Sequence, residues 1–427
     1  MARQIINNGE NGLSWKNKIN SNFEELYETA GAGVEDYWYG FEMTKGQTDG
    51  QVTKIKGDGV PTGSYPVSDK FYPAVVNEDA SINYELNPNN LTQKKDGSAS
   101  DLSGADGDAK VIMPEYYYKF ELEGNTVRFK ESPYALEGFT RLPTSYWGIF
   151  PGDEDGNGKF RSRSNVTPLT NKTRPYYRGI SSAKGTGWCM EPFWWYMIHY
   201  FTAVSYFGNL NSQEFLGEGA TNAASGDWSG YNGYYPVWTS DGSAASSYGS
   251  GTVTSTPANA NEANLVNGQI PVTVSSWGDG TKTLNTNIAV MWWVRDMFGH
   301  TLKFQDGINI NYTSTAAEVY ICKNPAHFAD DTTTNYEKLA DIAENSGYIS
   351  EFVAGTILPA VGGVAGSSSE HCGDRHYSLG LSSGWRVAQF GGSLSYGSSA
   401  GLLCSYFNSA SGSDAPSFGA RLCWVDV

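Results

Sequence analysis

The side chains best suited to chemistry are histidines, cysteines and carboxylates, but their spacing completes no metal site. Residues 371–376 read His-Cys-Gly-Asp-Arg-His, a cluster of potential ligands that matches no established zinc pattern. Asp153, Asp155 and Asn157 place oxygen ligands at alternate positions ahead of a glycine, as in a calcium loop. The twelfth position is Ser164 where a full calcium loop requires glutamate. We therefore expect a solvated acidic turn here, and neither metal nor cofactor.

Nucleophilic catalysis is not indicated either. No Gly-x-Ser-x-Gly elbow follows a convincing strand and precedes a helix. The five cysteines are odd in number and lack the paired close spacing of a disulfide framework or a zinc site. We predict that this chain is not an enzyme and that its thiols are reduced and mostly buried. These thiols are Cys189, Cys322, Cys372, Cys404 and Cys423.

The C-terminal segment has an unusual composition between two motif-like stretches, which we call its frame. Residues 384–393 read Gly-Trp-Arg-Val-Ala-Gln-Phe-Gly-Gly-Ser, and residues 419–423 read Gly-Ala-Arg-Leu-Cys. Between Phe390 and Ala420 the chain has no Lys, Glu, Gln, Met or Trp. None of those residue types can be reached from an asparagine codon by changing only its adenines. Regularly recurring aromatic and aliphatic residues favour short strands over a disordered linker, and the alternative is an ordinary Ser/Gly-rich β segment.

This segment resembles the variable region of proteins diversified by an adenine-specific retroelement. Its motif is similar to that of their C-type-lectin-like display domains, best known in phage tropism determinants and related in fold to formylglycine-generating enzymes. The resemblance covers about residues 110–427, with support from residues 187–213 and 298–310. His300 and Phe304 depart from the family, which usually has Asn and Trp there, and these departures weaken an enzymatic interpretation more than the fold.

The resemblance implies that changeable side chains contact a ligand while frame residues hold the backbone. We expect the contact residues to be exposed together and the frame residues to be tied into the fold. The implied contact residues are His371, Arg375, His376, Leu394, Ser395, Tyr396, Ser399, Leu402, Cys404, Tyr406 and Asn408. The implied frame residues are Trp385, Arg386, Gly391, Gly392 and Arg421.

Three regions are expected to position these residues. Residues 1–34 contain an amphipathic helix pattern at 14–27 and resemble the segment that joins phage tail fibres to the virion. Residues 35–110 alternate short apolar pieces with turn residues, which predicts a small β-rich module or a linker. Residues 111–427 are expected to form one display domain, in which the Gly-, Ser- and Ala-rich stretch 217–263 is an insertion of long loops.

Composition supports a β-rich α+β fold, because the chain is 14% aromatic and 17% charged and contains 50 glycines in 427 residues. The tyrosine row at 116–118 predicts a half-buried strand. The apolar run at 193–207 predicts a buried helix, since it is shorter than the roughly 20 residues that span a bilayer. A net charge of −16 argues against a nucleic-acid partner. We expect no membrane insertion and no secretory signal.

The resemblance implies a receptor-binding protein of a phage tail fibre or tail tip. We expect it to be made in the bacterial cytoplasm, to reside in the virion and to recognise a glycan or protein of the host-cell surface. Residues 1–34 would contact other tail proteins, and the resemblance implies a homo-oligomer, with a trimer favoured. Two alternatives are a glycan-binding adhesin of fixed specificity, which suits the aromatic content, and a formylglycine-generating-type oxidase, which would need cysteines and a metal.

Overall fold

The structure is a computed structural model that describes residues 34–223, 265–277, 282–363 and 366–426, with three short strands at 235–238, 245–248 and 254–257. The helix expected at 14–27 lies outside the described residues, as does nearly all of the expected attachment segment 1–34. Most of the expected insertion at 217–263 lies outside them too.

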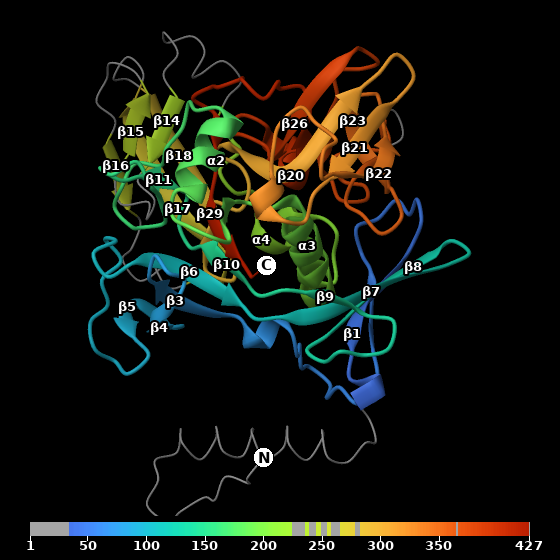
Figure 1. Cartoon of the computed structure of the whole chain (residues 1–427), viewed down its shortest axis with the longest axis horizontal. Coiled ribbons are helices and arrows are strands. Elements are labelled where there is room, and N and C mark those ends of the chain that lie inside the picture. Colours follow the sequence, from blue (N-terminus) through green and yellow to red (C-terminus); the bar gives the residue numbers. More distant parts are fainter. Residues whose placement is uncertain are drawn as a thin grey trace, which may run out of the picture.

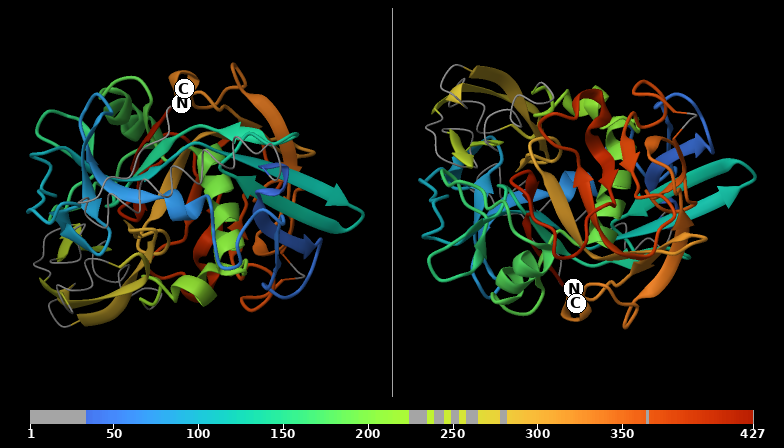
Figure 2. Two further views of the ribbon diagram at one scale, coloured as in Figure 1. Left: turned by 90° about the horizontal axis from the view of Figure 1, so that it is seen from below. Right: turned by 90° about the horizontal axis from the view of Figure 1, so that it is seen from above.

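A five-stranded sheet forms one side of the molecule, in the order β2-β1-β8-β7-β9. Its strands are β1 (Tyr39–Thr44), β2 (Thr53–Lys56), β7 (Tyr116–Glu123), β8 (Thr126–Ser132) and β9 (Thr140–Leu142). Tyr116 and Tyr118 are buried and Tyr117 is half-buried, so the predicted half-buried strand is confirmed. The hairpin of β7 and β8 extends at one end of the molecule (Figures 1 and 2).

A second sheet joins the N-terminal and C-terminal parts of the chain in the order β13-β29-β10-β6-β3-β4-β5. Its strands are β3 (Tyr72–Val76), β4 (Ile82–Asn87), β5 (Asn90–Lys94), β6 (Asp108–Met113), β10 (Ser145–Gly148), β13 (Trp188–Met190) and β29 (Leu422–Val425). Strand β3 pairs with β6, and β1 pairs with β8 of the first sheet. Strands of residues 35–110 therefore pair with strands from later in the chain, and Phe41, Val75 and Val425 share one hydrophobic core.

A third sheet of nine strands carries the C-terminal segment, in the order β22-β21-β20-β26-β27-β25-β23-β24, with β28 on β20. Its strands are β20 (Leu302–Tyr312), β21 (Ala317–Ile321), β22 (Glu337–Ile342), β23 (Gly347–Phe352), β24 (Pro359–Gly363), β25 (Arg375–Tyr377), β26 (Gly384–Gly391), β27 (Gly401–Tyr406) and β28 (Phe418–Gly419).

The other strands form smaller sheets. The pairs are β11 with β12 and β14 with β15, and β16 to β19 make a four-stranded sheet. The bounds are β11 (Asp153–Glu154), β12 (Phe160–Arg161), β14 (Tyr235–Trp238), β15 (Ala245–Tyr248), β16 (Thr254–Pro257), β17 (Asn267–Trp277), β18 (Lys282–Met291) and β19 (Val294–Arg295). Short 3-10 turns are η1 (Val34–Asp36), η2 (Ser68–Lys70), η4 (Pro325–His327) and η5 (Gly397–Ser399).

The helices are α2 (Arg174–Ser182), α3 (Phe193–Phe207) and α4 (Ser212–Leu216). Helix α3 contacts β1 and β8 on one side and β20 on the other, and it runs through the middle of the molecule in Figure 1. It is apolar all round, which suits a helix covered on every side, and it ends at Gly208 with φ 81°. The predicted buried helix is confirmed, and so is the β-rich α+β class. No helix in the described part of the chain is both long and apolar enough to cross a membrane.

Candidate functional site

Six half-buried side chains gather on the third sheet and the loop before β27. We call them the tyrosine face, and they are Tyr348, Arg375, Tyr377, Tyr396, Ser399 and Tyr406. Strand β25 pairs with β23 through Arg375 and Tyr348, and with β27 through Tyr377 and Tyr406. Directly paired residues point to the same side of a sheet, so the register alone brings these four side chains together.

Ring contacts hold the tyrosine face together. The ring of Tyr377 lies with its centroid 5.2 Å from that of Tyr396 and 5.8 Å from that of Tyr406. The Arg375 guanidinium lies 5.2 Å from the Tyr377 centroid and 5.9 Å from the Tyr348 centroid. Burial raises the pKa of Tyr377 to about 12, so its hydroxyl stays protonated at neutral pH. The arrangement presents aromatic area, hydroxyls and one guanidinium, which suits binding better than catalysis.

Buried polar side chains fix the backbone beneath this face. The Tyr196 hydroxyl donates to the Leu402 carbonyl at 2.5 Å, and the Leu402 amide donates to Ser212 Oγ at 2.9 Å. Gln213 Nε2 donates to the carbonyls of Gly397 and Ala400 at 3.0 and 2.6 Å. Because these donors and acceptors come from α3 and α4, the helices set the backbone position while the side chains of the tyrosine face remain partly exposed.

The implied frame residues differ in how firmly they are held. Arg421 is fully buried, and its Nε donates to Glu191 Oε1 at 2.9 Å. Gly391 and Gly392 are buried with φ of 100° and 72°, and a Cβ at Gly392 would lie 2.8 Å from that of Ala400. Trp385, which was also expected to be tied into the fold, is held less firmly.

Trp385 and Arg386 are less enclosed than expected. Trp385 is only half-buried on β26, with its ring centroid 5.9 Å from that of Tyr320. Arg386 is also half-buried, and its Nη1 donates to the Trp385 carbonyl at 2.6 Å. Both side chains lie on the outer part of β26, before the strand enters the core at Val387.

Five of the implied contact residues are buried, which corrects the expectation that all eleven are exposed together. They are His371, His376, Leu394, Leu402 and Cys404. Strand β27 lies between β26 and β25 and beneath α4, so it is buried from Gly401 to Ser405. His376 points to the opposite side of β25 from Tyr377, where its Nδ1 lies 2.8 Å from Ser405 Oγ. Leu394 packs in a separate core cluster with Ile288.

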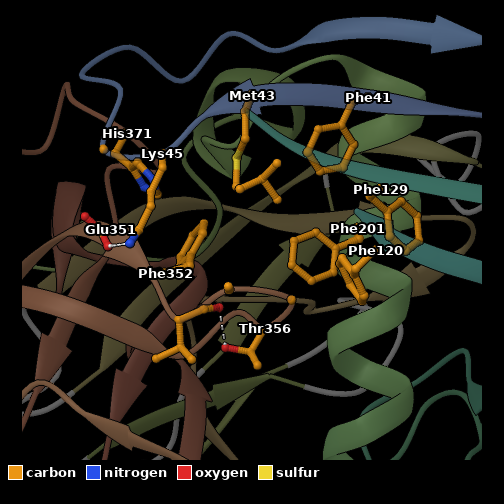
Figure 3. Close-up of a pocket in the computed structure, with 15 residues that line it drawn as sticks. Phe41, Met43, Lys45, Phe120, Phe129, Phe201, Glu351, Phe352, Thr356 and His371 are labelled. Atoms are coloured by element: carbon orange, nitrogen blue, oxygen red, sulfur yellow. Dashed lines mark hydrogen bonds and ion pairs between the residues drawn. The ribbon is translucent and has the colours of Figure 1, made fainter. Parts of the chain in front are cut away.

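His371 lines a small aromatic pocket near β1 and α3 instead of the tyrosine face (Figure 3). The ring centroid of His371 lies 4.5 Å from that of Phe352. Burial lowers the pKa of His371 to about 4. Lys45 and Glu351 form an ion pair of 3.0 Å beside it. The pocket has a volume of about 20 Å³, enough for a water molecule and too small for a ligand.

The other implied contact residues are partly accessible. Arg375, Tyr396, Ser399 and Tyr406 belong to the tyrosine face, and Ser395 and Asn408 are half-buried as well. The sequence-based list did not include Tyr348 or Tyr377, which complete this face. Tyr377 stands next to His376 in a strand, so the alternation of side chains along β25 was the signal that could have found it.

The acidic turn is held by arginines. Asp153 Oδ2 accepts from Arg163 Nε at 2.8 Å, and Asp155 Oδ2 accepts from Arg161 Nη1 at 3.2 Å. Asp155 Oδ1 accepts the backbone amide of Asn157 at 2.9 Å. Within the described ranges, no group of three or more His, Cys, Asp or Glu side chains is arranged to hold a metal ion.

A buried polar chain that the sequence did not reveal runs from Ser145 to Glu131. His199 lies with Nε2 3.0 Å from Ser145 Oγ and with Nδ1 3.0 Å from the Tyr116 hydroxyl. Thr202 Oγ1 lies 3.0 Å from that hydroxyl and donates to Glu131 Oε2 at 2.6 Å. The Ser–His pair resembles a catalytic pair, but all these side chains are buried and bond to one another. A histidine within the apolar run 193–207 was the available signal.

Glu131 gives this chain a pH dependence that can be measured. Burial raises its pKa from 4.5 to about 8, so the folded protein keeps a proton there that the unfolded chain has lost. Folding then binds a proton between these pH values, and the folded state loses stability as pH rises. We expect the free energy of unfolding of Glu131→Gln, relative to the wild type, to rise by roughly 2 kcal/mol between about pH 6 and pH 8.

Urea unfolding at both pH values measures this difference, in which the titration of all other groups cancels. Glu121→Gln is the matched control, because its half-buried carboxyl pairs with Lys119 and Lys130, and its pKa is already lowered. If the difference in free energy of unfolding between Glu131→Gln and the wild type were the same at pH 6 and pH 8, Glu131 would be ionised in the folded state.

The cysteines are all free and buried. Cys189 and Cys423 are directly opposed on β13 and β29. Burial raises the pKa of each of these thiols and of Cys372 and Cys404 well above its usual range. Protonated, enclosed thiols are poor nucleophiles, which gives the oxidase alternative no support.

Comparison with models of known protein families finds no match for this chain, and comparison with curated protein sequences finds none either.

Proposed function

We propose that this chain is a receptor-binding protein of a phage tail and that the tyrosine face is its recognition surface. The observation that carries the proposal is the position of this face. It lies where the segment free of Lys, Glu, Gln, Met and Trp reaches the outside of a rigid frame. Side chains there can change while the backbone beneath them stays fixed by α3 and α4.

The chemistry of the tyrosine face fits recognition of a partner surface. Tyrosine supplies large contact area at low entropic cost, and serine and asparagine supply adaptable hydrogen bonds. Arg375 adds a guanidinium already ordered by two rings. The contact set that we propose is narrower than the sequence implied, because buried side chains such as Leu402 and Cys404 cannot reach a ligand.

The remaining parts of the proposal rest on the sequence resemblance. On this proposal, the third sheet and α3 belong to a C-type-lectin-like display domain. Residues 1–34 attach the protein to other tail proteins in the virion, and the chain assembles as a trimer. Several copies on one particle would raise avidity for the host cell beyond that of a single weak site.

Tyr396→Ala and Tyr406→Ala test the recognition surface. Each change is expected to weaken binding of the labelled protein to cells about 30-fold, since truncating an aromatic anchor commonly costs about 2 kcal/mol. The unfolding temperature should change little, because both rings are half-buried. Binding is titrated on the strain that takes up most wild-type protein from a panel of bacterial strains.

Tyr320→Ala is the matched control, a half-buried tyrosine of β21 whose ring lies tilted against Trp385, away from this face. It should keep wild-type binding. Unchanged binding by both test variants, or a loss fully explained by unfolding, counts against the tyrosine face as the recognition surface.

A further inference from the structure

A second candidate binding site shares no lining residue with the tyrosine face. An open cleft of about 460 Å³ is bounded by β7 and β9, by the start of α3 and by the loop that contains η4. This volume falls within the range of about 300–1,000 Å³ that is usual for small-ligand sites. None of the six residues of the tyrosine face lines the cleft.

The cleft has an aromatic base. Tyr118 and Trp195 are buried beneath it, and Trp195 Nε1 donates to the Pro143 carbonyl at 3.1 Å, which fixes the indole. Trp194 is half-buried and forms an aromatic wall of the cleft. Ordered aromatic surface of this kind binds the apolar faces of ring-shaped ligands.

The rim of the cleft is polar. Asn324, His327 and Asn335 are exposed there. Asn324 Oδ1 accepts the Ala326 amide at 3.0 Å, so the group that Asn324 offers to a ligand is its Nδ2 donor. A ligand that stacks on Trp194 would meet amide groups at its edge.

The charges around the cleft are already paired. Arg141 forms ion pairs with Glu115 and, at 3.7 Å, with Asp426. Lys323 lies 3.3 Å from Glu337. No uncompensated charge among these groups calls for a charged ligand, and a polyhydroxylated, uncharged ring best matches an aromatic wall with an amide rim.

We propose that this cleft binds an uncharged saccharide, whose ring stacks on Trp194 and whose hydroxyls bond to Asn324 and Asn335. At present the Lys323 ammonium lies 3.8 Å from the Trp194 ring centroid. That side chain is 47% exposed and its partner Glu337 is 68% exposed, so moving it aside costs little. Saccharide binding displaces Lys323 from the indole.

Titration of the full-length protein with a panel of neutral oligosaccharides built from glucose, galactose or N-acetylglucosamine tests the proposal, with calorimetry as the readout. Trp194→Ala is expected to weaken the best binder about tenfold or more, and Trp194→Phe should keep most of the affinity. Lys323→Ala should bind as well as the wild type or better, because it uncovers the indole. Tyr396→Ala should not change this binding.

Three outcomes would overturn the proposal. They are wild-type protein that binds no neutral oligosaccharide at millimolar concentration, folded Trp194→Ala that binds like the wild type, and affinity confined to acidic oligosaccharides that is lost in Lys323→Ala. Tyr396→Ala separates the two sites, since its loss of cell binding tests the tyrosine face alone. Saccharide binding to the cleft can therefore succeed or fail whatever the outcome at the tyrosine face.

Discussion

Replacing Arg421 by methionine is expected to lower the free energy of unfolding by roughly 3–5 kcal/mol. The guanidinium is fully buried and donates to Glu191 and to the carbonyls of Gly148 and Arg295, the latter two at 2.8 and 2.5 Å. Methionine removes the charge and all these donors. The Glu191 carboxylate, which is also buried, then keeps within the described part of the chain the hydrogen bond from Gln305 at 2.6 Å and no cation in contact.

A double-mutant cycle identifies the cause of this loss. Adding Glu191→Gln to Arg421→Met should recover part of the stability, because it removes the unpaired buried charge. Arg386→Met is the control, since that arginine is half-buried and donates to the carbonyl of its own neighbour. It should change stability by less than about 1 kcal/mol. Urea unfolding of Arg421→Met, Glu191→Gln, the double variant and Arg386→Met decides the matter, and an Arg421→Met protein as stable as Arg386→Met would refute the structural role of Arg421.

Leu402→Ala is expected to cost about 2–5 kcal/mol of stability, the usual loss for a leucine removed from a core. The side chain is 1% exposed and lies beside Trp147, Tyr196 and Met297. Its backbone is held on both sides by Tyr196 and Ser212, so the surroundings have little freedom to close the cavity. The measurement is thermal and urea unfolding of the purified variant.

Ser398→Ala is the matched control in the same segment, because Ser398 is exposed. It should unfold like the wild type within about 0.5 kcal/mol. If Leu402→Ala were equally harmless, Leu402 would be an accessible, changeable position as the sequence resemblance implied, and its place in the core would be wrong.

Local patterns in the sequence predicted local structure well. The mainly apolar run 193–207 forms the buried helix α3, because a helix that is apolar on nearly all sides must be covered on every side. The tyrosine row at 116–118 became half-buried strand β7, since its alternation is a property of the strand itself. The β-rich class was predictable from the many glycines and aromatics, because short strands and tight turns depend on the residue types within them.

Long-range pairing was not predictable in this way. Turn residues between strands do not reveal which strands pair, so the sequence did not show that β1 pairs with β8 and β3 with β6. Within the C-terminal segment, composition could not show that Leu402 is buried while Tyr406, on the same strand β27, is partly exposed.

The sequence by itself determined the β-rich class, the central buried helix and the segment whose residue types are restricted, because each is written in neighbouring residues. Only the tertiary structure decided which side chains of that segment reach solvent. Strand β27 is enclosed by β25, β26 and α4 until its last residue, and this covering comes from residues distant in the chain. The aromatic cleft likewise exists only where β7, β9, α3 and the loop at η4 meet.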